Sequence, residues 1–176
     1  MVPLIFGIAL LIFASPAFCA NRTVENSCPS NQVRDVGKRN FAILGNTCYM
    51  FYRKDRVNYE IARQRCQKDN GDLAMPKTKD INDFLLKEMK RINQFSAMWI
   101  GMNDLDTEGK YYWEDGTKVR AWGNMAIGRL IGGFFSGQRE DCIALDPGDG
   151  KWHDYRCPSQ WSLRDHTLDY ICQYPI

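Results

Sequence analysis

The chain has 176 residues, enough for one domain with a buried core of its own. Charged residues make up 25% of the sequence and hydrophobic residues 44%, which is ordinary globular composition. The formal net charge of +2 is too small to indicate binding to nucleic acid or to a membrane surface.

The sequence opens with an apolar run from Leu4 to Phe13, followed by small residues. This pattern is typical of a secretory signal peptide, and the run is too short to span a bilayer. We expect residues 1–20 to be a signal peptide, cleaved at 17–20, after Ala17 or after Cys19. No second long apolar run follows, so no transmembrane anchor is predicted. Asn21 begins a glycosylation sequon, which is consistent with export.

The cysteine count depends on where the signal peptide ends. If Cys19 leaves with it, six cysteines remain: Cys28, Cys48, Cys66, Cys142, Cys157 and Cys172. An even number in an oxidising compartment indicates disulfides, although the spacing alone does not choose among the many pairings. A retained Cys19 could link two chains, so a covalent homodimer stays open.

The first half of the chain predicts a hairpin and two helices. Residues 41–52 are mostly apolar around Gly45-Asn46, a turn dipeptide, and read as two short strands. Residues 58–71 place Tyr59, Ala62 and Cys66 on one helical face, with Asn58 able to cap the start. Residues 78–93 carry an apolar stripe, with acids early and bases late, as the helix macrodipole prefers.

After Phe95 the sequence predicts short aromatic strands separated by Gly- and Asp-rich turns. The turn "DPGDG" at 146–150 joins two of them into a hairpin, with Asp146 and Asp149 as turn residues. Between Lys118 and Arg139 no periodicity is evident, which indicates a long loop. Helices first and strands later favour an α+β fold with a mostly antiparallel sheet.

Four blocks resemble a C-type lectin-like domain. They are "ARQRCQKDNGDLAMPKTKDINDFL", "WIGMNDLDTEGKYYWEDG", "EDCIALDPGDGKWHDYRCPS" and "YICQY". The similarity covers residues 28–174 and implies a disulfide-stapled fold of two helices, a mostly antiparallel sheet and a long loop. It implies the pairings Cys66–Cys172 and Cys142–Cys157, and Cys28–Cys48 as the extra bridge of the longer form. It also implies that Trp99 and Trp113 belong to the core.

Members of this family that bind sugars do so through a calcium ion, which requires six to eight oxygen ligands. The resemblance places Glu140 and the triplet Trp152-His153-Asp154 at this primary site, but His153 replaces an asparagine. Calcium selects oxygen over imidazole nitrogen. The family's proline-containing loop tripeptide is missing, and the loop charges are all positive: Lys118, Arg120, Arg129 and Arg139. We expect the primary site to be incomplete.

The family's auxiliary calcium site is better preserved. Asp104, Glu108, Glu140 and Asp141 match its positions, and Asp154 completes the candidate metal ligands. The alternative is that these acids are solvated or pair with loop arginines. Candidate ligand contacts are Glu140, His153, Asp154, Trp122 and Arg129. Residues 124–139, rich in apolar side chains and glycine, are either tucked onto the core or exposed as a contact patch.

The resemblance implies a secreted recognition protein that binds an extracellular glycan, with calcium-independent protein binding as the alternative. A homodimer through the long loop is a further possibility. No enzyme is expected, because the only histidines are His153 and His166 and no nucleophile motif accompanies them. A zinc site from these histidines matches no known spacing. A third possibility is a structural protein of the same fold that contacts mineral or ice, and the mildly basic charge counts against mineral binding.

Overall fold

The computed structural model describes residues 28–120, 124–126, 141–157 and 166–176. The predicted signal peptide, Cys19 and the sequon at Asn21 lie outside the described residues, as do Trp122, Arg129 and Glu140. Within the described part of the chain, no helix is long and apolar enough to cross a membrane.

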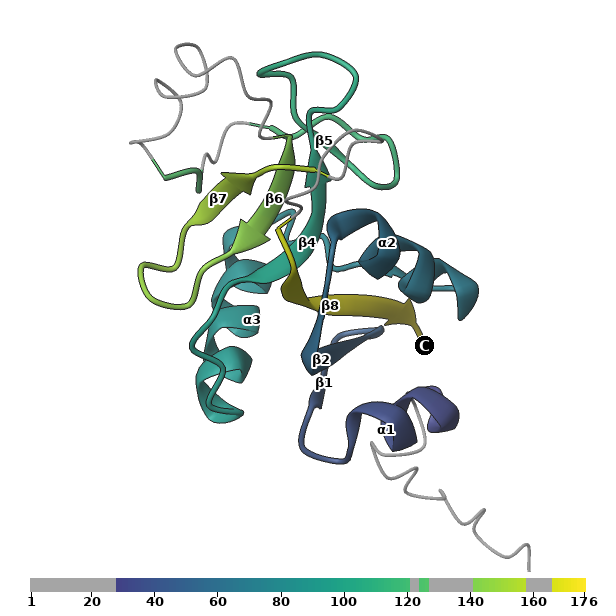
Figure 1. Ribbon diagram of the computed structural model, residues 1–176. Coiled ribbons are helices and arrows are strands. Elements are labelled where there is room, and N and C mark those ends of the chain that lie inside the picture. The colour runs from purple at the N-terminus through teal and green to yellow at the C-terminus, as the bar shows by residue number, and fades with distance from the viewer. Residues whose placement is uncertain (1–27, 121–123, 127–140, 158–165) are drawn as a thin grey trace, which may run out of the picture.

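In the described part of the chain, three helices pack around one sheet (Figure 1). The elements in chain order are α1 Ser30–Val36, β1 Phe41–Leu44, β2 Thr47–Val57, α2 Tyr59–Lys68, β3 Asp72–Leu73, α3 Lys79–Arg91, β4 Met98–Asn103, β5 Tyr112–Trp113, β6 Cys142–Leu145, β7 Trp152–Tyr155 and β8 Leu168–Pro175. Helices α2 and α3 lie on either side of the sheet, and α1 lies beside β1 and β2 (Figure 1). The strand order is β1-β2-β8-β4-β6-β7, with β3 on β8 and β5 on β4. The pair β4–β8 is parallel and the other pairs are antiparallel. The predicted α+β fold with a mostly antiparallel sheet is confirmed.

The two predicted helices begin at capping side chains. Asn58 Oδ1 accepts from the Ile61 N–H at 2.9 Å at the start of α2, and Thr78 Oγ1 accepts from the Ile81 N–H at 3.3 Å at the start of α3. Helix α1 was not predicted. It has no side-chain cap at its start, and its seven residues are too few for a periodic apolar stripe.

The sheet is covered on both faces. Helix α2 contributes Tyr59, Ala62 and Cys66 to one buried cluster, which also contains Trp99. Helix α3 contributes Leu85 and Met89 to a second cluster, which also contains Trp113, Trp152 and Ile92, the residue directly after α3. The two helices accordingly lie on opposite sides of the sheet (Figure 1). Trp99 and Trp113 are buried in the core, as the resemblance implied.

The structure contains the three disulfides that the resemblance implied: Cys28–Cys48, Cys66–Cys172 and Cys142–Cys157. The first joins the start of the described chain to β2, and the second joins α2 to β8 across 106 residues of sequence. The third closes the β6–β7 hairpin. This last bridge fixes both ends of the segment that carries His153 and Asp154, and Asp141 lies directly before it.

Candidate functional site

The loop that follows β4 carries two of the candidate metal ligands. The Asp104 N–H donates to the Asp141 carbonyl oxygen at 3.1 Å, which attaches the loop to the residue just before β6. The Gly109 N–H donates to Asp104 Oδ2 at 2.7 Å and closes the loop on itself. Gly109 has a φ of +74°, a conformation that glycine adopts without steric cost. These contacts bring Asp104 and Glu108 to Asp141, although the chain separates them widely.

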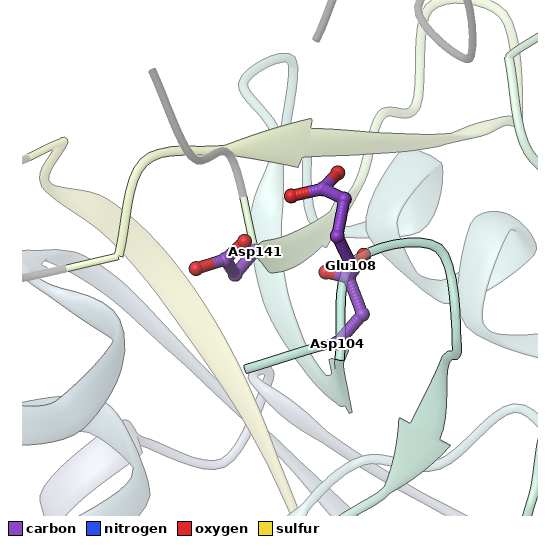
Figure 2. A group of neighbouring side chains, drawn as sticks. All are labelled: Asp104, Glu108 and Asp141. Atoms are coloured by element: carbon purple, nitrogen blue, oxygen red, sulfur yellow. The ribbon is translucent and has the colours of Figure 1, made fainter. Parts of the chain in front are cut away.

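Figure 2 shows the resulting group of three carboxylates, two on the β4–β5 loop and one at the start of β6. One carboxylate oxygen from each of Asp104, Glu108 and Asp141 lies within 4.8 Å of the other two. Asp104 and Asp141 are buried, with 1% and 5% of their surface exposed, and Glu108 is exposed. The group therefore has two buried oxygen donors and one that reaches it from the solvent side.

Burial and mutual repulsion make Asp104 hard to ionise. Removal from water raises the pKa of Asp104 to about 6, a rise that the Gly109 hydrogen bond opposes and that Asp141 and Glu108 increase. Asp104 Oδ1 has no hydrogen-bond partner among the residues that the structure describes. The pKa of the neighbouring Tyr111 phenol is also raised, first by burial and then by the negative charges of Asp104 and Asp154. A cation in this position would relieve these costs.

The three carboxylates fit a calcium ion. Calcium–oxygen distances are about 2.3–2.6 Å, so two oxygens on opposite sides of one ion lie about 5 Å apart. The separations in the group satisfy this limit, and all of the donors are oxygen, which a hard cation selects. Asp104, Glu108 and Asp141 would hold the ion, and water would complete its coordination sphere.

The triplet on β7 is arranged differently. Trp152 is fully buried, and its Nε1–H donates to Asn82 Oδ1 at 2.9 Å, so it is part of the core. His153 Nε2 lies 2.9 Å from Asp149 Oδ2 in the β6–β7 turn. Burial opposes ionisation of Asp149, but its hydrogen bonds from the Lys151 N–H and His153 lower its pKa. His153 thus has a partner inside its own hairpin.

The five candidate metal ligands are therefore not all placed together. Asp104, Glu108 and Asp141 form the group; Asp154 is buried at 6% exposure and is not a member of it among the described residues. Glu140 lies outside the described residues, as do the candidate ligand contacts Trp122 and Arg129. Sequence reasoning missed the pairing of His153 with Asp149. The sequence could have indicated this contact, because His153 follows Asp149 by four residues and Asp149 lies in the turn predicted at 146–150.

Comparison with known proteins places these features in a family. The model of the Lectin C-type domain matches residues 55–173. A tetranectin-like protein of Carcharhinus perezii is 31% identical over 131 residues, which cover 73% of this chain and 71% of the relative. The low affinity immunoglobulin epsilon Fc receptor of Mus musculus is 33% identical over 137 residues, 78% of this chain and 36% of the receptor. The chain thus spans about a third of that receptor's length.

Solved structures agree. The cow C-type carbohydrate-recognition domain of CD23, crystallised in the presence of a GlcNAc2Man3 oligosaccharide, is 26% identical, with a TM-score of 0.63 and coverage of 78% of this chain and 94% of that chain. Human lithostathine, at 22% identity and a TM-score of 0.65, shares the fold over 87% of this chain and 94% of its own. The matching residues include both predicted helices and the acidic group, and the chain belongs to the C-type lectin domain family.

Proposed function

We propose that this chain is a secreted recognition protein that binds an extracellular glycan or protein and holds one calcium ion at its auxiliary site. The observation that carries the proposal is the group of Asp104, Glu108 and Asp141, whose oxygens lie within 4.8 Å of one another. A buried carboxylate that gains a cation loses the penalty of being charged in a low dielectric. Calcium would therefore stabilise the link between the β4–β5 loop and β6.

The primary sugar-binding calcium site is proposed to be incomplete. Its asparagine position holds His153, whose imidazole contacts Asp149. No Asp or Glu occurs between Asp115 and Glu140, so the long loop has no carboxylate to offer a dication. A glycan bound by this protein would then be held by contacts other than hydroxyl coordination to a calcium ion.

Calcium-independent protein binding is the second candidate. The long loop favours it, because residues 116–139 combine four basic side chains with apolar ones and contain no acid. The names of two similar proteins agree with parts of this candidate. One relative is an immunoglobulin Fc receptor, and one solved structure is a calcium-independent type II antifreeze protein. Catalysis is not proposed, since His153 contacts a turn carboxylate and no nucleophile motif accompanies it in the sequence.

Thermal unfolding with calcium and with chelator tests the metal. We expect calcium to raise the melting temperature of the wild-type protein and to have no effect on Asp141→Asn, which keeps the shape of the side chain but removes its charge. Asp146→Asn, in the β6–β7 turn, is the matched control and should respond as wild type does. Equal melting curves of the wild-type protein with and without calcium would refute the calcium site.

A glycan array run with calcium and with chelator separates the two kinds of partner. Binding to a glycan that persists in chelator is expected if the primary site is incomplete. Strictly calcium-dependent binding to mannose or galactose that disappears in Asp154→Ala would show the primary site to be intact. An empty array under both conditions, with a melting shift by calcium, would favour a protein partner.

Secretion, glycosylation and dimerisation are part of the proposal. The three disulfides support an oxidising compartment. Mass spectrometry of the protein collected from culture medium would identify the cleavage position within 17–20 and a glycan on Asn21. If Cys19 is retained, electrophoresis without reductant is expected to show a covalent homodimer. A monomer band from a protein that retains Cys19 would exclude a disulfide between two chains.

A further inference from the structure

A cavity lies at a different place in the fold from the acidic group. It has a volume of about 430 Å³ and is bounded by α1, by the residues that end α2, and by the end of β8. Its size falls within the range of small-molecule sites, about 300–1,000 Å³. In Figure 1, α1 and the end of β8 lie in the lower half of the view, whereas the β4–β5 loop lies at the top. The two sites are therefore at different ends of the domain.

Gln32 is the informative residue of this cavity. It lines the cavity, yet 3% of its surface is exposed, and its Oε1 has no hydrogen-bond partner within the described part of the chain. A buried amide oxygen without a partner is unfavourable, because it has lost its hydrogen bonds to water. The Gln32 Oε1 atom is therefore a position at which a hydrogen-bond donor of a ligand would be favourable.

The other lining groups define what the cavity can accept. Asn31 and Asn70 add two amides, and each amide offers both a donor and an acceptor. Asn70 has a φ of +60°, which explains an asparagine at the end of α2 without any ligand, so the argument rests on Gln32. Lys68 and Asp69 carry opposite charges that cancel, so the cavity has no net attraction for an anion or a cation.

Three ring-bearing residues complete the lining. Pro29 and Pro175 offer carbon atoms beside the amides, whereas Tyr174 is buried, with 1% of its surface exposed. A ligand that fits must be neutral, must carry several hydroxyl groups that both donate and accept, and must offer C–H faces to these rings. A hydrocarbon would leave the amides without partners, and a phosphate would face the carboxylate of Asp69.

We propose that the cavity between α1, the end of α2 and the end of β8 binds a neutral sugar residue without calcium, with the Gln32 amide as its central hydrogen-bonding group. This site is independent of the calcium ion proposed above. It uses one carboxylate, that of Asp69, which is too few for a calcium site. It provides a route to glycan binding that does not need the primary site.

The test is a titration of the isotope-labelled, full secreted protein in chelator, followed by NMR chemical shifts. The probes are D-glucose, D-galactose, D-mannose and N-acetyl-D-glucosamine at millimolar concentrations, with glycine as a zwitterionic comparison. We expect saturable shifts for the amides of residues 31, 32 and 70 with at least one sugar. Gln32→Met should weaken this binding about tenfold, because the hydrogen bonds of one buried amide are lost.

The controls separate binding from folding and from calcium. Gln67→Met makes the same chemical change on the exposed face of α2 and should bind as wild type does. Gln32→Met should melt at the same temperature as wild type or higher, since it removes a buried group without a partner. Asp141→Asn should leave the sugar shifts unchanged even if it abolishes the response to calcium.

Three results would overturn the proposal. One is the absence of shifts with every sugar, and another is shifts confined to residues 104–111 and 141–154. The third is binding of glycine but of no sugar, which would assign the cavity to a zwitterion through Lys68 and Asp69. The effect of calcium on the melting temperature is measured separately. A negative sugar titration therefore does not contradict the proposed calcium site, and a negative calcium result does not contradict the proposed sugar site.

Discussion

At the scale of single residues, Asp104 connects the fold to the proposed calcium ion. Folding buries it, the Gly109 N–H fixes one of its oxygens, and the other has no partner in the described residues. A buried carboxyl group with a fixed position and a raised pKa is typical of a functional site. The sequence identifies Asp104 as a candidate through the family resemblance, but its burial and its raised pKa follow from the tertiary contact with Asp141.

The pH dependence of stability follows from this shift. The folded state holds the Asp104 proton more tightly than the unfolded chain, since burial raises the pKa of Asp104 from 3.8 to about 6. In chelator, the stabilisation is complete below the unfolded value and is lost as the pH rises through about 6. The rise corresponds to about 3 kcal/mol. Between about pH 4 and pH 7 the wild-type protein should lose this stability and Asp104→Asn should not. The unfolding free energy of Asp104→Asn, measured relative to wild type, is therefore expected to rise by about this amount.

Urea denaturation at a series of pH values measures this difference. Other carboxyl groups also shift on folding, although Asp115 titrates below this range: burial opposes its ionisation, but hydrogen bonds from Lys77 and Thr117 lower its pKa to about 2. Their contribution is common to both proteins and cancels in the comparison. A difference that does not change with pH would contradict the assignment of the buried acid to Asp104.

His153 allows a second prediction at this scale. If the histidine alone had disabled the primary site, His153→Asn would restore it. The long loop still lacks any carboxylate, so we expect His153→Asn to bind the same number of calcium ions as wild type. Isothermal titration calorimetry measures this number. A second bound ion in His153→Asn would mean that oxygens other than loop carboxylates complete the primary site.

At the scale of elements, the sequence predicts what is long and periodic. Helices α2 and α3 have caps and apolar faces that are visible in the sequence, and Gly45-Asn46 marks the β1–β2 turn. Helix α1 and the two-residue strand β3 are too short to show a period, whereas β5 falls within one of the aromatic strands predicted after Phe95. They form because tertiary neighbours complete their hydrogen bonds, as when the Ala74 N–H donates to the Ile171 carbonyl at 2.8 Å just after β3.

Gly71, between α2 and β3, shows how closely these elements approach. A Cβ atom added there would lie 2.5 Å from Tyr174 Cε1 and 2.6 Å from the Gln173 carbonyl oxygen. A backbone oxygen in a paired strand cannot move away easily, so we expect Gly71→Ala to destabilise the fold by about 1–3 kcal/mol. Chemical denaturation measures the loss.

The matched control is Gly148→Ala in the exposed β6–β7 turn. Its nearest neighbour would be a side-chain oxygen, Asp146 Oδ1, at 3.0 Å, which can rotate away. A smaller loss is therefore expected for Gly148→Ala than for Gly71→Ala. The reverse order would mean that α2 and β8 can separate at this point without cost.

At the scale of the whole molecule, the candidate site depends on contacts that no local pattern shows. Asp104 and Asp141 belong to different parts of the sequence and meet because β6 pairs with β4. Family resemblance anticipated this meeting and the three disulfides, whereas cysteine spacing alone left the pairing undecided. Which carboxylates form the group, and that His153 contacts Asp149, required the folded chain, because both depend on hydrogen bonds between residues on neighbouring strands and turns.

The disulfides offer a prediction about how the whole chain is held together. In the chain-entropy model, a bridge stabilises the fold by restricting the unfolded chain, and its effect grows with the loop that it closes. The Cys66–Cys172 bridge has a sequence separation of 106 and the Cys28–Cys48 bridge one of 20. The model gives about 4.8 and about 3.3 kcal/mol, respectively. Replacing both cysteines of a bridge by alanine should therefore cost about 1.5 kcal/mol more for Cys66–Cys172.

The comparison is matched in chemistry and burial, because the same side-chain atoms are removed and all four cysteines are buried. Guanidinium denaturation of the two variants measures the difference in unfolding free energy, which is more reliable than either loss alone. An equal loss would mean that local packing around each bridge, and not loop length, sets its contribution.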